Sequence, residues 1–182
     1  MMFKKKFEKG CMLVIGGARS GKSAFALDVC HRLKGKRVFL ATAEALDEEM
    51  KKRIDRHRTE RGAEWLSVEE PLNVAGAIEE KDGQDRIILL DCLTLWLNNL
   101  YMRYGGKEEI IEREVERLLK TLSHVAGAVV AVSNETGMGI VPKDPLSRSY
   151  RDTLGSLNRR VGEVSKKVVA LMAGLPLALK DE

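Results

Sequence analysis

The hydrophobic positions of this chain fall into short, fully apolar runs separated by longer amphipathic segments. Short apolar runs that end at glycine or at a charged residue are typical of buried strands. Segments that are apolar at every third or fourth position are typical of helices packed on one side. The strands predicted in this way are 12–15, 37–42, 86–91, 128–132, 168–173 and 177–179, and the helices are 23–33, 45–58, 110–125 and 146–164.

Strands that are apolar throughout and alternate with helices indicate a parallel sheet that is covered on both faces. We therefore predict an α/β fold with a mainly parallel sheet. A chain of 182 residues is long enough for one such domain, and no repeat or low-complexity linker divides it. We place this domain at residues 12–182 and expect residues 1–11 to be a frayed, basic N-terminal extension.

Charge and composition argue against several classes of protein. The net charge is +4, but the first ten residues supply +3 of it, so the rest of the chain is almost neutral. Because a nucleic-acid-binding domain needs a basic surface on its folded body, we expect no nucleic-acid partner. The most apolar stretch, 87–100, contains Asp91 and two asparagines and is too short for a transmembrane segment. The three separated cysteines fit neither a disulfide framework nor a zinc site, and they indicate a cytoplasmic protein.

A phosphate-binding motif directly follows the first predicted strand. Residues 16–23 read Gly-Gly-Ala-Arg-Ser-Gly-Lys-Ser and match G-x-x-x-x-G-K-[ST] in full. The glycines let backbone N–H groups converge on phosphate oxygens, and the next helix directs its positive dipole end at the same anion. Its place between a strand and a helix favours this interpretation over a glycine turn without a ligand. The predicted phosphate-binding residues are Gly16, Gly17, Ala18, Arg19, Ser20, Gly21, Lys22 and Ser23.

Asp91 ends the apolar strand 86–91 and gives it the form of a Walker B element. In such elements the acid holds magnesium directly or through water. Alone, an acid at a strand end is usually a helix cap or a solvated turn, but the phosphate-binding motif favours the metal role. We therefore predict that Ser23 and Asp91 hold Mg²⁺.

His57 combines an apolar position with a strongly basic neighbourhood. On a helical projection it points with the apolar stripe of helix 45–58, which is the setting of a packed histidine. However, four nearby arginines favour an anion and would keep the imidazole neutral and nucleophilic, so both interpretations stay open. These arginines are Arg53, Arg56, Arg58 and Arg61. His31 and His124 lack such a setting, and we expect them at the surface or at helix ends.

Several further blocks follow the phosphate-binding motif in order. They are Ala-Thr-Ala-Glu (41–44), Arg-Ile-x-x-His-Arg around His57, Trp65 with Glu69, Leu-Leu-Asp-Cys-Leu-Thr (89–94), Ser-Asn-Glu-Thr-Gly-Met-Gly-Ile-Val-Pro (133–142) and Arg-Asp-x-x-Gly-x-x-Asn (151–158). From about residue 12 to the C-terminus, the chain resembles the bifunctional adenosylcobinamide kinase / adenosylcobinamide-phosphate guanylyltransferase family. The phosphate-binding motif is generic, but the histidine segment and the 133–142 block are specific to that family.

This resemblance implies a RecA-like P-loop fold, a homotrimer and two activities. ATP or GTP phosphorylates the aminopropanol arm of adenosylcobinamide; GTP then gives GMP to a histidine, which passes it on to yield adenosylcobinamide-GDP. The matching catalytic positions are His57 and Lys22. Beyond residues 16–23, the matching nucleotide contacts are Ala41, Thr42, Ala43, Arg58, Thr59, Glu60, Arg61, Glu69 and Asp91. The implied partners are nucleotide and corrinoid substrates, with Mg²⁺ as cofactor.

The chain departs from the family pattern at three points and leaves alternatives open. Residues 1–10 are extra, and we expect them to be inert. The chain has Asn158-Arg159 where many relatives carry Asn-Gln, and Asp91 where some carry Glu. One alternative is a plain small-molecule kinase in which His57 only packs. Another is a nucleotide-binding interaction module without turnover. Asn134, Glu135, Gly137 and Gly139 follow a strand, and they either shape the corrinoid or nucleotide pocket or form a structural turn.

Overall fold

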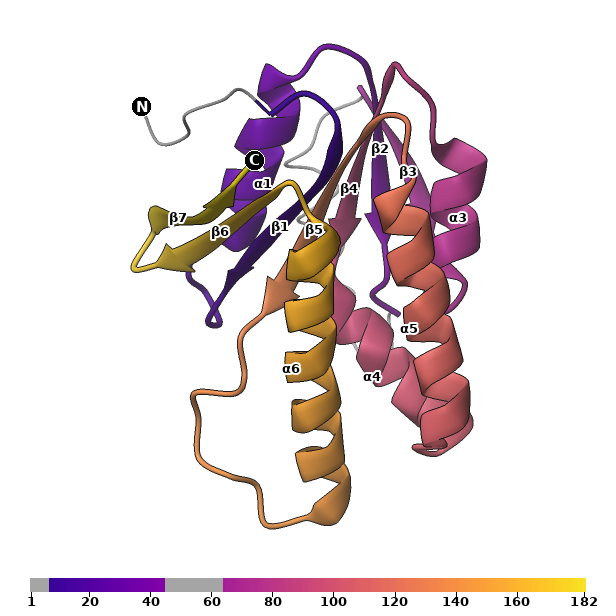
Figure 1. The fold of residues 1–182 in the computed structure, drawn as a ribbon, viewed down its shortest axis with the longest axis vertical. Helices are drawn as coiled ribbons and strands as arrows, with labels where there is room; N and C mark the ends of the chain where they lie inside the picture. Colours follow the sequence, from indigo (N-terminus) through magenta and orange to yellow (C-terminus); the bar gives the residue numbers. More distant parts are fainter. Residues whose placement is uncertain (1–6, 45–63) are drawn as a thin grey trace.

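A single mixed sheet organises the computed structural model, which describes residues 7–44 and 64–182 (Figure 1). The strand order is β3-β2-β4-β5-β1-β6-β7. Strands β1 to β6 run parallel, and β7 pairs antiparallel with β6. The strands are β1 (Gly10–Gly16), β2 (Lys36–Ala41), β3 (Trp65–Glu69), β4 (Arg86–Asp91), β5 (Ala128–Asn134), β6 (Lys167–Met172) and β7 (Leu175–Asp181).

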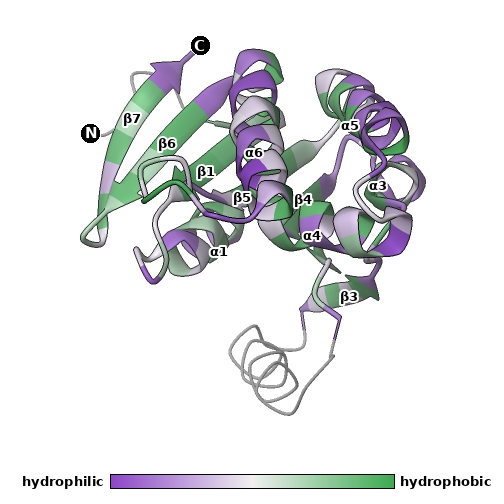
Figure 2. Ribbon diagram, turned by 90° about the horizontal axis from the view of Figure 1, so that it is seen from below, coloured by the Kyte–Doolittle hydropathy of each residue, from purple (hydrophilic) through white to green (hydrophobic). Residues whose placement is uncertain are grey.

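Helices cover both faces of the sheet (Figures 1 and 2). They are α1 (Lys22–Arg32), α3 (Val74–Lys81), α4 (Leu93–Tyr104), α5 (Glu108–Ser123) and α6 (Pro145–Val164). Helices α3 to α6 pack on one face and α1 on the other, which gives the molecule two hydrophobic cores. The predicted α/β architecture with a mainly parallel sheet and helices on both faces is confirmed.

The two cores explain why the central strands are apolar at every position. In β4, Ile88 and Leu90 lie in the core beneath α3 to α6, whereas Ile87 and Leu89 face α1. Successive side chains of a strand point to opposite faces, so a strand covered on both sides must be apolar throughout.

Some predicted boundaries were wrong. Strand β1 begins at Gly10 and Phe7 is buried in the α1-side core, so ordered structure starts before the predicted boundary at residue 11. Strand β7 is longer than the predicted 177–179. Elements β3, α3 and α4 were not predicted, and the predicted helix 45–58 lies outside the described residues. Within the described part of the chain, no helix is long and apolar enough to cross a membrane.

The carboxyl ends of the six parallel strands meet at one edge of the sheet, which Figure 2 shows from below. In open α/β sheets, ligands bind outside the carboxyl ends of the strands. The connections that leave this edge include the phosphate-binding motif, residues 41–44 and the long 135–144 segment that leads into α6.

Candidate functional site

The phosphate-binding loop leaves β1 at Gly16 and turns into α1 at Gly21, and two of its glycines are required by its geometry. Gly21 is the N-cap of α1 and has a left-handed backbone with φ 94°, which disfavours a residue with a Cβ. A Cβ on Gly16 would lie 2.5 Å from the carbonyl oxygen of Leu171 in β6. The loop can therefore follow its path only because glycine occupies these two positions.

Lys22 lies in the first turn of α1 with only 8% of its surface exposed. Its ammonium group donates to the carbonyl of Gly17 at 2.5 Å and lies 3.5 Å from the hydroxyl of Ser20. The side chain thus folds back over the loop, where an anion held by the loop's N–H groups would meet the positive charge. Ser23, the next residue, is partly buried in the same turn.

Three predicted nucleotide contacts line up across neighbouring strands. In the parallel register, Glu69 of β3 pairs with Ala41 of β2, and Ala41 pairs with Asp91 of β4. Ala41 packs against the α1-side core, and residues at the same register position of a pleated sheet share a face. Glu69 and Asp91 therefore flank Ala41 on the face that carries α1 and Lys22. Their Cα atoms are two strand spacings apart, about 10 Å.

Thr42 follows this row, and all of its polar atoms bond within the chain. Its hydroxyl donates to the carbonyl of Cys92 and accepts from the Cys92 N–H, at 2.8 and 2.9 Å. Its N–H donates to the carbonyl of Asp91, and its carbonyl accepts from Asn99. Thr42 thus ties the ends of β2 and β4 together. The predicted nucleotide contact at Thr42 stays a prediction.

A buried polar network holds the end of β5 beside the phosphate-binding loop. Asn158 of α6 accepts from the Ser133 hydroxyl at 2.6 Å and donates to the Asn134 carbonyl at 2.9 Å. The Asn134 N–H donates to the hydroxyl of Thr94 at 2.8 Å, and the Tyr150 hydroxyl donates to the Thr94 carbonyl. The sequence alone does not predict these hydrogen bonds, although Asn158 is the last residue of the 151–158 block.

The network acts on the phosphate-binding loop through β5, because β5 is the neighbour of β1. Asn134 pairs in register with Gly16, and the Glu135 N–H donates to the Gly16 carbonyl at 3.0 Å. Helices α4 and α6 therefore fix the strand from which the loop starts.

The structure brings residues 16–23, 41–43, Glu69 and Asp91 together at one edge of the sheet. The predicted nucleophile His57 and the predicted contacts 58–61 lie outside the described residues. His31 and His124 are exposed, and His124 is the C-cap of α5, as expected.

The donor atoms at this edge suit a hydrated magnesium ion. Ser23 contributes a hydroxyl and Asp91 a carboxylate, and hard cations such as Mg²⁺ prefer oxygen ligands. Among residues 7–44 and 64–182, no group of three or more His, Cys, Asp or Glu side chains could form an all-protein metal cage. Because Mg²⁺ usually keeps several waters and binds through one or two side chains and the substrate phosphates, the residues fit this ion.

None of the cysteines is a nucleophile at neutral pH, although Cys92 is adjacent to Asp91. Burial raises the pKa of the Cys92 thiol to about 11, and the charge of Asp91 acts in the same direction. Burial also raises the pKa of Cys11 to about 11 and that of Cys30 to about 12. All three cysteines are free and buried, as predicted.

The fold resembles solved P-loop structures. The RadB recombinase superposes with a TM-score of 0.54 at 15% sequence identity, with 90% of this chain and 75% of that one covered. The flagellar accessory protein FlaH from Methanocaldococcus jannaschii gives a TM-score of 0.51 at 11% identity, with 95% of this chain and 79% of that one covered. These similarities identify the predicted RecA-like P-loop fold.

Sequence comparison identifies relatives along almost the whole chain. The bifunctional adenosylcobalamin biosynthesis protein CobP of Pseudomonas aeruginosa is 42% identical over 170 residues, which cover 93% of this chain and 97% of CobP. The bifunctional adenosylcobalamin biosynthesis protein CobU of Escherichia coli is 33% identical and is covered to 99%. Residues 12–179 match the family described as cobinamide kinase / cobinamide phosphate guanyltransferase. The chain therefore belongs to the cobinamide kinase / cobinamide phosphate guanyltransferase family.

Proposed function

We propose that this protein phosphorylates adenosylcobinamide and then transfers GMP from GTP to the product, giving adenosylcobinamide-GDP. The observation that carries this proposal is a complete phosphate-binding loop, with Lys22 folded over it, in a chain that matches the bifunctional family over residues 12–179. The proposal is also supported by the row of Glu69, Ala41 and Asp91, because these predicted nucleotide contacts lie on the face that carries α1 and Lys22.

In the kinase step, the acceptor oxygen forms a bond to the γ-phosphorus and its proton is released to water. The bond from the γ-phosphorus to the β–γ bridging oxygen breaks, and the nucleoside diphosphate leaves. Such a reaction depends on positioning and on neutralising charge, and the loop's N–H groups, the α1 dipole and Lys22 provide both. Ser23 and Asp91 would hold Mg²⁺, which supplies further neutralisation of phosphate charge when bound.

In the transferase step, His57 is the proposed nucleophile. An imidazole nitrogen forms a bond to the α-phosphorus of GTP, and the bond to the β-phosphate oxygen breaks to release pyrophosphate. The phosphate of the phosphorylated cobinamide then takes GMP from the histidine. This splits one exchange between two bulky anions into two simpler displacements. Residues 41–43, 58–61 and Glu69 are the proposed nucleotide contacts.

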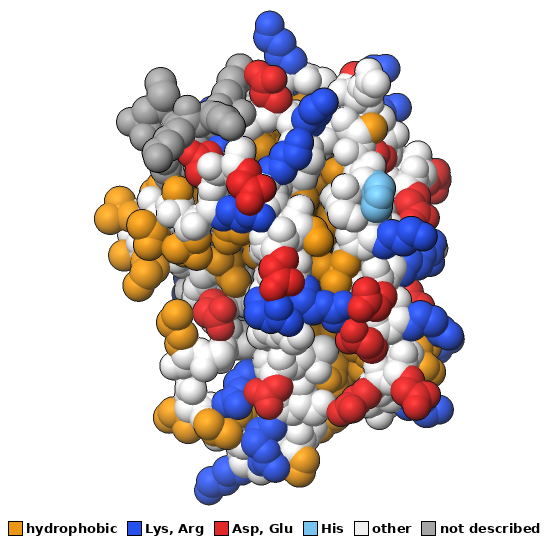
Figure 3. Space-filling model, viewed as in Figure 1, with side chains coloured by type: hydrophobic (Ala, Val, Ile, Leu, Met, Phe, Trp, Pro, Cys, Tyr) orange, Lys and Arg blue, Asp and Glu red, His pale blue; other side chains and the backbone are white. Residues whose placement is uncertain are grey.

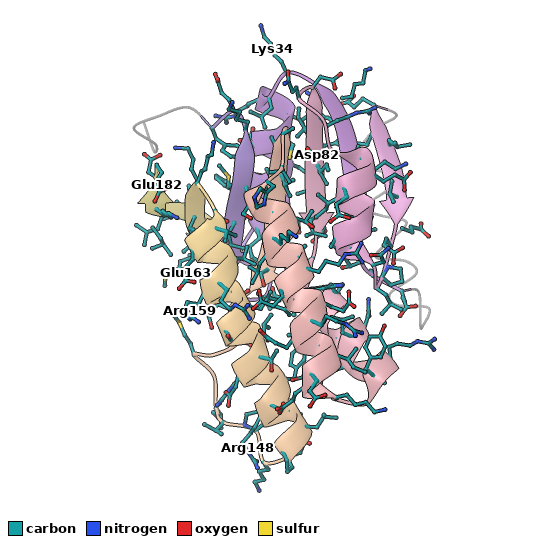
Figure 4. The ribbon with its side chains drawn as sticks, turned by 45° about the vertical axis from the view of Figure 1, so that its right-hand side comes forward. Lys34, Asp82, Arg148, Arg159, Glu163 and Glu182 are labelled. Carbon is teal, nitrogen blue, oxygen red and sulfur yellow. The ribbon has the colours of Figure 1, made fainter. Side chains whose placement is uncertain are left out.

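The test supplies adenosylcobinamide, Mg²⁺ and GTP or ATP to the full chain and identifies the corrinoid products by mass. We expect a phosphorylated corrinoid, followed by adenosylcobinamide-GDP when GTP is present. Lys22→Ala should slow phosphorylation by about 100-fold or more, on the scale of losing one transition-state charge contact. Lys34→Ala is the matched control, because Lys34 is exposed at the opposite end of the molecule (Figure 4). Phosphorylation without GMP transfer would leave only the plain kinase.

A homotrimer is the proposed assembly, supported by an unprotected apolar face on β7. Leu175 and Leu177 lie on one face of this edge strand, and Met172 of β6, which pairs with Leu175, lies on the same face. Leu179 lies at an irregularity in the β6–β7 register, and all four side chains are exposed. Figure 3 shows hydrophobic side chains gathered over this edge. An exposed apolar surface on an edge strand is an aggregation hazard unless another chain covers it.

The proposed location is the cytoplasm. The three cysteines are free and buried, and no two of them pair. Such thiols are normal in a reducing compartment, whereas secreted proteins generally pair theirs.

A further inference from the structure

The 135–144 loop, which joins β5 to α6, is fixed at both ends. At its start, the Glu135 N–H bonds to the Gly16 carbonyl, and the Glu135 carboxylate accepts from the Gly137 N–H at 2.7 Å. At its end, the Arg148 guanidinium donates to the carbonyls of Pro142 and Lys143 at 3.1 and 2.5 Å. Figure 4 shows Arg148 at the lower end of α6, where the loop arrives. The loop is thus a supported surface that starts at the phosphate-binding site.

Between these supports, the loop presents large apolar side chains to solvent. Met138 is 91% exposed, Ile140 is 97% exposed and Val141 is 58% exposed. Burying one such side chain is worth about 1.5–3 kcal/mol, so a folded chain gains nothing by leaving three of them in water. Exposed apolar groups gathered in one place usually mark a binding site.

The two glycines of the loop differ in what requires them. A Cβ on Gly137 would lie 2.9 Å from the Glu135 carboxylate, so a larger residue there would make that carboxylate shift. Gly139 does not have a positive φ, and a Cβ there would meet only the Thr136 carbonyl at 3.7 Å, an ordinary contact. The backbone conformation of the turn therefore does not require glycine at position 139. Gly139 leaves bare backbone between Met138 and Ile140, over which a flat ligand can pack.

Views from two directions place this loop and the phosphate-binding loop at the same edge of the sheet (Figures 1 and 2). The acceptor must bring one hydroxyl to the γ-phosphate, so the rest of the acceptor has to lie on a surface that flanks the phosphate-binding loop. A corrinoid has a broad macrocycle with apolar faces and an amide-bearing rim. The 135–144 loop offers apolar side chains for the faces and exposed backbone for the rim amides.

We propose that the 135–144 loop is the corrinoid-binding surface, with Met138, Gly139 and Ile140 against the macrocycle. This inference rests on the proposed function, because it takes the acceptor to be a corrinoid. The corrinoid substrate is the proposed occupant of the loop, whereas the apolar face of β7 is proposed to form the contact between copies of the chain.

The test measures equilibrium binding of adenosylcobinamide to the full chain, with Mg²⁺ and a non-hydrolysable GTP analogue, by dialysis and visible absorbance of the corrinoid. Met138→Ser and Ile140→Ser should each raise the Kd about tenfold, the effect of one lost apolar contact. Met102→Ser is the matched control, because Met102 is an apolar side chain that is 75% exposed on α4, outside the loop. It should change the Kd less than twofold. Binding of the GTP analogue and the oligomeric state should not change in any variant.

Each other outcome has a distinct meaning. If wild-type protein does not bind adenosylcobinamide, the proposed function fails and this inference fails with it. If wild type binds and the loop variants bind equally well, only the loop assignment is overturned. If the loop variants lose binding together with their oligomeric state, the loop is an interface between copies of the chain, and the assignment is again overturned.

Discussion

Asn158 shows how one buried side chain can organise a site that it does not line. It is 5% exposed, and its amide uses both of its functions, accepting from Ser133 and donating to Asn134. Asn134 pairs in register with Gly16, so a contact made from α6 acts on the start of the phosphate-binding loop. The sequence could not predict this, because Asn158 lies 24 residues from Asn134 and only the fold brings them together.

We expect Asn158→Ala to destabilise the protein by about 1–3 kcal/mol, because the buried Ser133 hydroxyl and Asn134 carbonyl lose their partner. It should also weaken nucleotide binding. The adjacent Arg159→Ala is the control, since it removes only an exposed ion pair with Glu163, and its effect should stay below about 0.5 kcal/mol (Figure 4). Urea unfolding measures both variants. Equal effects would show that the network contributes nothing specific.

The cysteines give a second expectation at this scale. Their pKa values, raised by burial to about 11 or 12, leave very little thiolate at pH 8. The native protein should therefore react slowly with a thiol-specific disulfide reagent, and all three thiols should react rapidly after unfolding in denaturant. Rapid reaction of one thiol in the native state would contradict the burial described for it.

At the scale of elements, α6 is well defined by its own sequence. Asp144 caps it by accepting from the N–H groups of Leu146 and Ser147, and Pro145 occupies the first turn. Hydrogen bonds from Ser147 and then Leu146 lower the pKa of the Asp144 carboxyl. Because the folded-state pKa is the lower one, the stabilisation is present above the unfolded pKa of about 3.9 and is lost as the pH falls through the folded value.

Asp144→Ala should therefore lower the Tm at pH 7, and the difference from wild type should shrink as the pH falls below about 4. Asp144→Asn keeps an accepting oxygen without the charge, so this variant should retain much of the stability. The contribution of residue 144 to stability should then no longer depend on pH. Thermal unfolding followed by circular dichroism between pH 7 and pH 3 distinguishes these cases. A pH-independent difference between wild type and Asp144→Ala would contradict the account.

The elements that sequence patterns revealed are those buried on one or both sides. The predicted elements include strands that are apolar throughout, namely β1, β2, β4 and β5. They also include two long helices with clear apolar periodicity, α5 and α6. Strand β3 is at the sheet edge and α3 has only eight residues, so neither has a long enough pattern. Helix α4 begins one residue after Cys92, and β4 and α4 therefore read as one apolar run. Likewise, the phosphate-binding loop and Asp91 were predictable from local motifs, whereas the network of Thr94, Tyr150 and Asn158 required the fold.

At the scale of the whole molecule, exposed apolar side chains of residues 7–44 and 64–182 gather at the β7 face and on the 135–144 loop (Figure 3). The two surfaces differ in location. The β7 face is an exposed apolar surface on an edge strand, where another copy of the chain can pack, whereas the loop adjoins the phosphate-binding site.

Light scattering coupled to gel filtration should give a mass near three times the 20.3 kDa of the chain. Leu177→Lys should shift that mass toward the monomer, because a charge would be buried in the interface. Met102→Lys, on α4, should leave it unchanged. A wild-type monomer would contradict the proposed assembly.

Covalent labelling tests whether this chain performs GMP transfer as well as phosphoryl transfer. Wild-type protein and His57→Ala are incubated with Mg²⁺ and GTP labelled at the α-phosphorus, without corrinoid, and are then separated on a denaturing gel. We expect label on the wild type that is lost in acid, survives alkali and is absent from the variant, as for a phosphoramidate on His57. A wild-type protein that binds GTP but retains no label would contradict the transferase assignment and leave a plain kinase in which His57 only packs.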